Sequence, residues 1–390
     1  MSTPRTSCQV DAQTPEHQIA REVSRRMFLK SSLTGAATLG TVGQLQAGDQ
    51  SQSAGSGSPI TPRPHDPLLT LVHHVTQGFS ETSFSEAQGM GYGAWLEWQL
   101  APELIDDSSL DVLLASLPSL PMTARELFEN YILTGNQNQP VIELKTAAVL
   151  RSALSRRQLY ERMVEFWTDH FNIFHRNGLD SILKTVDDRE VIRTHALGRF
   201  EDLLRASAKS SAMSYYLNND TNTVDNINEN YAREIMELHT LGVDGSYNEH
   251  DITELARRFT GWAYYPVGHP LFGEFAFFPA RHDNGEKILL GETIAAGGGI
   301  QDGEYMITFL AAHADTAQYV CGKLIKWLLG YEPSQELVDE AALAFTATNG
   351  EIKDVLRVIL ARRNIAKVPL GAQPKLRRLF HFVVSALRAS

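Results

Sequence analysis

Apolar residues recur with helical spacing along most of this chain, and this periodicity restricts the fold more than any other feature. From about residue 67 onward, segments such as "RRQLYERMVEFWTDHFNIF" and "TAQYVCGKLIKWLLG" place apolar side chains three or four positions apart. One stretch differs. Residues 262–295 combine aromatic residues with turn formers, which predicts a small β or irregular insertion of two or three short strands. The sequence therefore predicts a mainly α, multihelical globular domain over residues 67–390.

The segment before this domain has the pattern of an export leader. "SRRMFLK" resembles a twin-arginine export signal, and a weakly apolar run of small residues follows it as far as Ala47. We expect residues 1–47 to be a twin-arginine signal peptide and residues 48–66, rich in Ser, Gly, Gln and Pro, to be a flexible linker. The apolar run is too short and interrupted to span a bilayer stably. The sequence thus predicts a periplasmic or extracellular protein; the alternative is a chance basic patch before an apolar helix.

Charge and cysteine content exclude several kinds of partner and cross-link. The whole chain has a formal net charge of −11; without residues 1–47, which hold five Lys/Arg and three Asp/Glu, 30 basic and 43 acidic residues remain. An acidic surface repels phosphate backbones and anionic headgroups, so binding of nucleic acid or of a membrane surface is disfavoured. Because Cys8 lies in the leader, Cys321 is expected to be a buried apolar residue and to form no intrachain disulfide after processing.

The segment "NENYAREIMELHTLGV" (228–243) holds the most concentrated set of polar groups. On a regular helix, an arc of about 100° contains what we call the polar stripe: Asn230, Arg233, Glu234 and Glu237. His239 is expected at the flank of the stripe, and Gly242 is expected to end the helix. Glu234 and Glu237 are one turn apart, so they can bind one hard cation together or act as an acid and base. The alternative is a surface face on which Arg233 and Glu237 form an ordinary ion pair.

Two further segments bear on this choice. His170 lies on the aromatic side of "EFWTDHFNIF", where a lone histidine is more often a hydrogen-bonded core residue than a metal ligand. His282 and Asp283 lie in the polar loop "ARHDNGEK", where side chains can converge without the constraints of a helix. The alternative for this loop is a plain Asp-Asn-Gly turn. The glycine run 297–299 follows no clear strand, so we interpret it as a loop and not as a phosphate site.

Established catalytic signatures are absent from the sequence. It contains no Walker loop, no dinucleotide glycine fingerprint after a strand, no HExxH, no paired CxxC, no haem-attachment CxxCH and no nucleophile elbow. Any chemistry must therefore come from Glu, His and Asp side chains of separate segments.

Several blocks together resemble a bacterial family catalogued as domain of unknown function 1800. These blocks are "RQLYERMVEFWTDHFNIF", "REVIRTHALGRFEDLLRASAKSSAMSYYLNND", "NENYAREIMELHTLGVDGSYNEHDITELARRFTGW" and "FFPARHDNGEKILLG". The resemblance runs from about Leu68 to Leu387. It implies an exported protein, often encoded beside another exported family with an alkaline-phosphatase or sulfatase-like fold. It implies no established activity, substrate or cofactor. Other members continue past the final "VVSALRA", so this chain is expected to be shorter at its C-terminus than they are.

Three functional hypotheses follow. The first is an exported, metal-dependent hydrolase-like protein, with a divalent ion held by His170, Glu234, Glu237, His239, His282 and Asp283. Its candidate catalytic residues are Glu234, Glu237, Arg233 and Asn230. The second is a non-catalytic partner or maturation factor for a co-exported phosphatase- or sulfatase-like protein. The third is an extracellular polymer binder that uses Trp262, Tyr264 and Tyr265. Arginines that neutralise the carboxylates of the polar stripe would favour the second hypothesis over the first.

Overall fold

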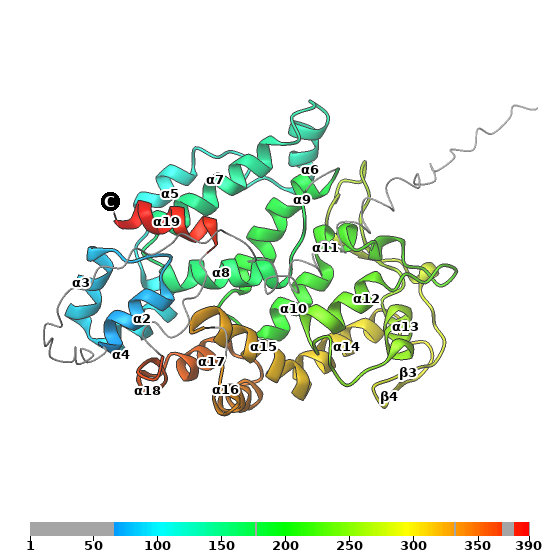
Figure 1. The fold of residues 1–390 in the computed structure, drawn as a ribbon. Helices are drawn as coiled ribbons and strands as arrows, with labels where there is room; N and C mark the ends of the chain where they lie inside the picture. Colours follow the sequence, from blue (N-terminus) through cyan, green and yellow to red (C-terminus); the bar gives the residue numbers. More distant parts are fainter. Residues whose placement is uncertain (1–65, 176–177, 331–332, 369–377, 390) are drawn as a thin grey trace, which may run out of the picture. The chain divides into compact units, whose positions relative to one another are not determined.

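A computed structural model describes residues 66–175, 178–330, 333–368 and 378–389 of the chain. The expected signal peptide (1–47) and all but the last residue of the expected linker (48–66) lie outside these residues. The described part is mainly α, as the helical periodicity predicts (Figure 1).

The helices of the first half follow one another with short connections. They are α2 (Pro67–Val75), α3 (Glu81–Met90), α4 (Tyr92–Leu100), η1 (Pro102–Leu104), α5 (Ser108–Leu114), α6 (Ala124–Leu127), η2 (Phe128–Ile132), α7 (Gln139–Leu154), α8 (Gln158–His170), α9 (Asp180–Asp187), η3 (Asp188–Arg193), α10 (Phe200–Lys209), α11 (Ser211–Tyr216) and η4 (Asn219–Thr221).

The second half adds the β insertion and the remaining helices. These are α12 (Asn230–Glu234), η5 (Ile235–His239), α13 (Glu249–Arg258), β1 (Trp262–Tyr264), β2 (Phe275–Phe277), η6 (Pro279–Arg281), β3 (Lys287–Leu289), β4 (Glu292–Ile294), α14 (Ile300–Ala312), α15 (Ala314–Leu328), α16 (Gln335–Ala347), α17 (Ile352–Ile359), α18 (Arg362–Ile365) and α19 (Leu379–Ala389). The segments η2, η3 and η5 are wider π-helical turns, whereas η1, η4 and η6 are 3-10 turns.

Side-chain caps define where several helices begin. Asp66 accepts a hydrogen bond from the backbone N–H of Leu68 at the start of α2, where Pro67 supplies a backbone angle suited to a first turn. At α13, Asn248 and Asp251 form a reciprocal capping box, in which each side chain accepts from the other residue's backbone N–H. These caps satisfy N–H groups that the helix itself leaves without partners.

Helix α8 lies in the middle of the described fold, against α2, α4, α7 and η3 (Figure 1). Its inward face carries Met163, Phe166 and Trp167, all almost fully buried. The Trp167 Nε1–H donates to the carbonyl of Ala196 at 2.9 Å, so its one polar group is also satisfied. Cys321 of α15 is buried as well, which confirms its expected apolar role, and burial raises the pKa of its thiol to about 12.

The β insertion lies where the sequence predicts it and contains four strands, one more than expected. Strands β1 and β2 pair antiparallel with Trp262 opposite Phe277, and β3 and β4 pair antiparallel with Lys287 opposite Ile294. Trp262 and Tyr264 are buried in the hydrophobic core. Core packing thus accounts for two of the three aromatic residues of the polymer-binding hypothesis.

None of the helices within the described residues is both long and apolar enough to cross a bilayer.

A pair of helical glycines tests this packing. A Cβ at Gly303 of α14 would lie 2.5 Å from the Trp262 ring, whereas a Cβ at Gly322 of α15 meets nothing within 4 Å. We expect Gly303→Ala to lower the free energy of unfolding by about 1–3 kcal/mol because the buried indole has no room to move. Gly322→Ala should raise it by roughly 0.5–1 kcal/mol because alanine favours the helix. Urea denaturation of both variants measures this, and equal effects would contradict the packing described.

Candidate functional site

The polar stripe lies on a helix that is shorter and less regular than the sequence predicts. Helix α12 begins at Asn230, whose backbone N–H donates to the Asn228 side chain at 3.0 Å. From Ile235 the helix widens into the π-turn η5, and the Thr240 hydroxyl donates to the Ile235 carbonyl at 2.6 Å. The chain then turns at Gly242, which has a φ of 87° and confirms the expected end.

The π-turn changes the direction in which the last residues point. A π-helix turns less per residue than an α-helix, so each position after Ile235 lags behind its expected angle. His239, expected at the flank of the stripe, is instead buried in the core at 4% exposure. The expectation of a flank position was therefore wrong: His239 follows the buried Ile235 by four positions, which places both side chains on the apolar side of the helix.

Arg233 neutralises most of the exposed charge on this helix. It forms two hydrogen bonds with Glu249, at 2.6 and 2.9 Å, and also lies 3.4 Å from Glu237 and 3.5 Å from Glu229. Hydrogen bonds with Glu249 hold the pKa of the Arg233 guanidinium above its usual range, and they lower the pKa of the Glu249 carboxyl. Glu237 is thus one of several ion-paired side chains around Arg233 that remain partly exposed to water. Burial raises the pKa of the Tyr319 phenol of α15 to about 12, and the charge of the Glu234 carboxylate adds to this.

A second group of polar side chains lies beneath this helix, and we call it the imidazole cluster: Asp169, His170, His239, Tyr319 and Lys323. The His170 and His239 rings are 6.1 Å apart, and His170 Nε2 donates to the His239 carbonyl at 2.9 Å. Aromatic rings surround both residues, including Phe166 and Phe171. His170 is therefore a hydrogen-bonded core histidine, as the sequence favours.

Burial keeps both imidazoles neutral. Loss of solvation, followed by repulsion from the Lys323 ammonium, lowers the pKa of His239 to about 3 and holds that of His170 well below its usual value. Burial also lowers the pKa of Lys323 to about 8, although Asp169 opposes this. Burial raises the pKa of Asp169, which forms an ion pair with Arg378. Perturbed groups that gather in this way are found often at functional sites and also in structural networks.

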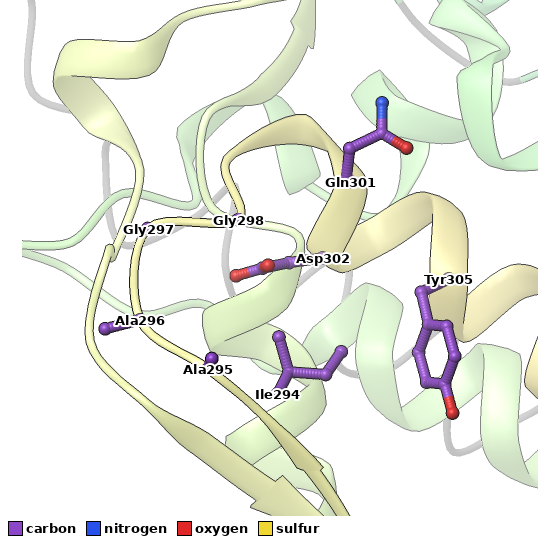
Figure 2. A pocket seen from close by; sticks show the side chains of 8 residues that line it. All are labelled: Ile294, Ala295, Ala296, Gly297, Gly298, Gln301, Asp302 and Tyr305. Atoms are coloured by element: carbon purple, nitrogen blue, oxygen red, sulfur yellow. The ribbon is translucent and has the colours of Figure 1, made fainter.

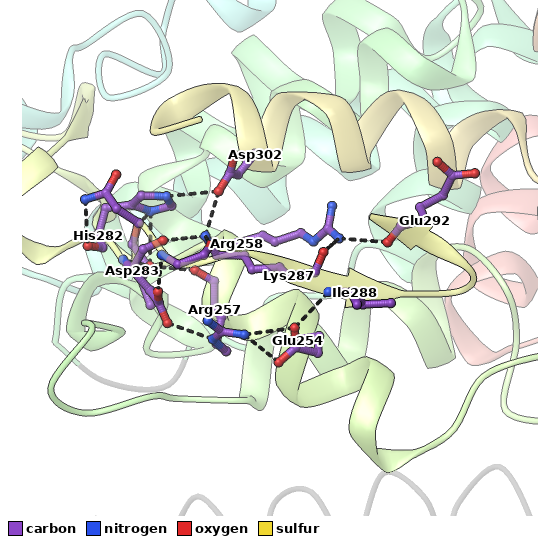
Figure 3. Close-up of polar contacts among 12 residues, drawn as sticks. Glu254, Arg257, Arg258, His282, Asp283, Lys287, Ile288, Glu292 and Asp302 are labelled. Atoms are coloured by element: carbon purple, nitrogen blue, oxygen red, sulfur yellow. Dashed lines mark hydrogen bonds and ion pairs between the residues drawn. The ribbon is translucent and has the colours of Figure 1, made fainter. Parts of the chain in front are cut away.

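His282 and Asp283 belong to a separate group, the Lys287 network, which comprises Arg257, Arg258, His282, Asp283, Lys287 and Asp302 (Figure 3). The Lys287 ammonium is fully buried and lies 2.7 Å from Asp302 Oδ2. His282 Nδ1 donates to the Thr260 carbonyl at 2.8 Å, which turns Nε2 toward the same Asp302 oxygen at 3.2 Å. Asp302 therefore holds both His282 and Lys287 in place.

Asp283 and Arg258 complete the Lys287 network on either side. Asp283 Oδ2 lies 2.7 Å from Arg257 Nε, and this contact lowers the pKa of the Asp283 carboxyl. Arg258 is fully buried, and burial lowers its pKa to about 10. Its Nη2 donates to the Lys287 carbonyl at 3.2 Å, while Nε and Nη1 have no hydrogen-bond partner among the described residues. A fully buried cation with two unpartnered donors is uncommon in proteins.

An open pocket of about 370 Å³ adjoins the Lys287 network at the start of α14 (Figure 2). It is lined by Ile294, Ala295, Ala296, Gly297, Gly298, Gln301, Asp302 and Tyr305. The glycine run 297–299, interpreted as a loop, forms part of its wall. Asp302 lies in the first turn of α14, where a carboxylate is stabilised by the helix dipole.

The six proposed metal ligands do not converge on one point. His170 and His239 lie together in the core, Glu237 pairs with Arg233, and His282 and Asp283 lie in the Lys287 network. Throughout the described ranges, no three His, Cys, Asp or Glu side chains are grouped so that they could hold a metal ion. The expectation of a single site is therefore corrected: Glu237 and His239 lie on opposite sides of their helix, and the β insertion holds His282 and Asp283 in a separate network.

Sequence reasoning missed Arg258, Lys287, Asp302 and Lys323. Lys287 is separated by two positions from the buried Leu289 in strand β3, so strand alternation predicts that both point inward. Asp302 follows a glycine run at a helix start, a pattern interpreted only as a loop. Arg258 and Lys323 lie in ordinary amphipathic helices, and no local pattern distinguishes them from surface cations.

The buried imidazoles predict a specific acid sensitivity. The folded-state pKa of His239 is about 3 and its unfolded value is about 6.5, so between these pH values the unfolded chain binds a proton that the native chain does not. His239 should therefore leave stability intact above about pH 6.5 and reduce it as the pH falls, by up to ~1.4 kcal/mol per pH unit. We expect His239→Gln to flatten the dependence of the urea midpoint between pH 7 and pH 5.

The matched control is His250→Gln, which replaces an exposed histidine at the start of α13. It should leave the pH dependence as in the wild type. An unchanged slope in His239→Gln would show that this imidazole does not stay neutral in the fold.

Comparison with known proteins gives one match. No curated protein and no solved structure matches the chain. The family described as "Protein of unknown function (DUF1800)" matches residues 70–390, which include the polar stripe, the imidazole cluster and the Lys287 network. The chain therefore belongs to the DUF1800 family.

Proposed function

We propose that this chain is an exported, non-catalytic helical protein that binds a co-exported protein with a phosphatase- or sulfatase-like fold, as its partner or maturation factor. The observation that carries this proposal is a set of large apolar side chains that remain exposed on three adjacent helices. Such sets are typical of protein interaction surfaces.

Helix α19 shows the feature most clearly. Its inward face buries His381 and Val384, and Arg388 on the same side donates to backbone carbonyls of Gly78 and Ala153. On the opposite face, apolar residues recur at helical spacing and are exposed: Leu379 at 78%, Phe382 at 66%, Val383 at 48% and Leu387 at 52%. A helix that is apolar on its solvent side as well as its core side is expected to pack against a further element.

The neighbouring helices also expose large apolar side chains. Helix α7 contacts both α19 and α5 (Figure 1). Helix α7 exposes Ile142 and Val149, and α5 exposes Val112 and Leu113. We call these eight side chains on α5, α7 and α19 the apolar surface.

The geometry of the polar stripe also favours a binding role over the metal-dependent reading. Glu237 is engaged by Arg233, which in turn binds Glu249 and Glu229. Arginine pairing of both stripe carboxylates is the arrangement expected for the partner hypothesis, and the pair of Arg233 with Glu237 supplies it for one of the two. The twin-arginine leader and the resemblance to exported proteins supply the proposed location, periplasmic or extracellular.

A double substitution on α19 tests the proposal. We expect Phe382→Ser/Val383→Ser to weaken binding of the purified phosphatase- or sulfatase-like protein by at least about tenfold, because two exposed apolar anchors are lost. Isothermal titration calorimetry measures the affinity, and far-UV circular dichroism checks the fold. Both residues are exposed, so the fold should persist.

Leu343→Ser provides the control, because Leu343 of α16 is 72% exposed and belongs to none of the three helices. It should bind as the wild type does. Unchanged affinity in the double variant would overturn the proposal. So would a wild-type chain that binds only a second copy of itself through this surface.

The metal-dependent hydrolase remains the second candidate function. The observation that favours it is the proximity of His170 and His239, whose lowered pKa values keep them in the neutral form that ligates metals.

Elemental analysis separates the two functions. The protein, purified after native export without chelators, is compared with Glu234→Ala/Glu237→Ala. The partner proposal expects no stoichiometric metal in either sample, because the described residues place no third metal ligand together with the two imidazoles. About one equivalent of a transition metal, lost in the variant while the fold persists, would establish the hydrolase candidate instead.

A further inference from the structure

The pocket at the start of α14 has a buried carboxylate, that of Asp302, in its lining. Asp302 lines it and is 1% exposed. Its Oδ2 is occupied by Lys287 and His282, whereas its Oδ1 is buried and has no hydrogen-bond donor among the described residues. Figure 2 shows the carboxylate directed from α14 toward the loop that carries Ala295 to Gly298. A buried carboxylate oxygen without a donor is costly, so this position favours a ligand or water that supplies one.

The donor must come from the pocket side. Lys287 and His282 occupy the side of Asp302 that faces the Lys287 network. On the other side lies Gly298, where a Cβ would lie only 1.9 Å from Oδ1. Glycine at this position is thus what allows the carboxylate to sit beneath the loop and beside the pocket.

Charges around the pocket restrict the kind of ligand. An anionic group would meet the Asp302 carboxylate. A cationic group would meet the positive end of the α14 dipole and the buried cations Lys287 and Arg258. A neutral group with hydroxyls satisfies both conditions, because a hydroxyl can donate to Oδ1 and also accept from other groups.

The walls suit a ring with apolar faces. Ile294, Ala295 and Ala296 are apolar, and Tyr305 is 44% exposed. The Tyr305 hydroxyl donates to Glu292 at 2.9 Å, which fixes the ring in one orientation. The exposed aromatic ring and the Gln301 amide line this open pocket of about 370 Å³, and the Asp302 carboxylate is buried beside them.

We propose that this pocket binds a neutral saccharide unit, with an aliphatic face of the sugar against Tyr305 and a hydroxyl that donates to Asp302 Oδ1 directly or through one water. The site uses none of the residues of the apolar surface, so it goes beyond the proposed partner function and can fail independently of it.

The test is isothermal titration of the full chain with defined oligosaccharides. The neutral probes are cellopentaose, maltopentaose and the pentamer of N-acetylglucosamine. The charged probes are pentagalacturonate and the glucosamine pentamer. We expect saturable binding of at least one neutral probe and none of the charged probes. Binding of only a charged probe, or of no probe at all, would overturn the proposal.

Variants locate the site on the protein. Tyr305→Ala should weaken binding of the neutral probe by about tenfold, whereas Tyr305→Phe, which keeps the ring, should retain most of it. Both changes are at an exposed position and should fold. Gly298→Ala should also weaken binding, because the added methyl displaces the Asp302 carboxylate. Leu343→Ala, on the distant surface of α16, is the control. Equal affinity in Tyr305→Ala and the wild type would place the saccharide elsewhere and refute this site.

Discussion

The structure depends on the burial of the aromatic face of α8. Met163, Phe166 and Trp167 are almost completely removed from water, and the indole also donates a hydrogen bond to Ala196. Helices on several sides pack against α8, so their apolar stripes have one common core to face. His170 lies on the same helix face, and burial there keeps its imidazole neutral. The electrostatic character of the imidazole cluster is thus a consequence of core packing.

A second constraint acts at the β insertion, where charges are buried and must be paired. Lys287 points inward because it shares one face of β3 with the buried Leu289, two positions further on, and Asp302 at the start of α14 neutralises it. Loss of one partner in such a pair typically costs about 3–5 kcal/mol, because the other charge stays buried. This requirement ties the insertion to α14 and places the glycine loop over the Asp302 carboxylate. The pocket lies between the end of the β insertion and the start of α14, beside this buried ion pair.

The two proposed binding regions differ in their physical basis. The apolar surface on α5, α7 and α19 offers area that remains exposed to water and gains from burial against a protein. The pocket offers little area, but Asp302 Oδ1 beside it is a buried acceptor that receives no hydrogen bond from the residues the structure describes. A protein partner and a small neutral ligand are therefore compatible on one molecule. Elsewhere on the molecule, charged groups pair within the chain, as Arg233 does with Glu229, Glu237 and Glu249.

The sequence by itself determined the mainly α fold, the position of the β insertion, the end of the polar helix at Gly242 and the burial of His170 and Cys321. These depend on the spacing of apolar residues and on local backbone preferences, which a linear pattern records. Only the tertiary structure decided that Glu249 is the main partner of Arg233, and that His282 and Lys287 share the Asp302 carboxylate. The contacts of Arg233 with Glu249 and of His282 with Asp302 join residues 16 and 20 positions apart, and their pairing depends on how the helices and the insertion pack together.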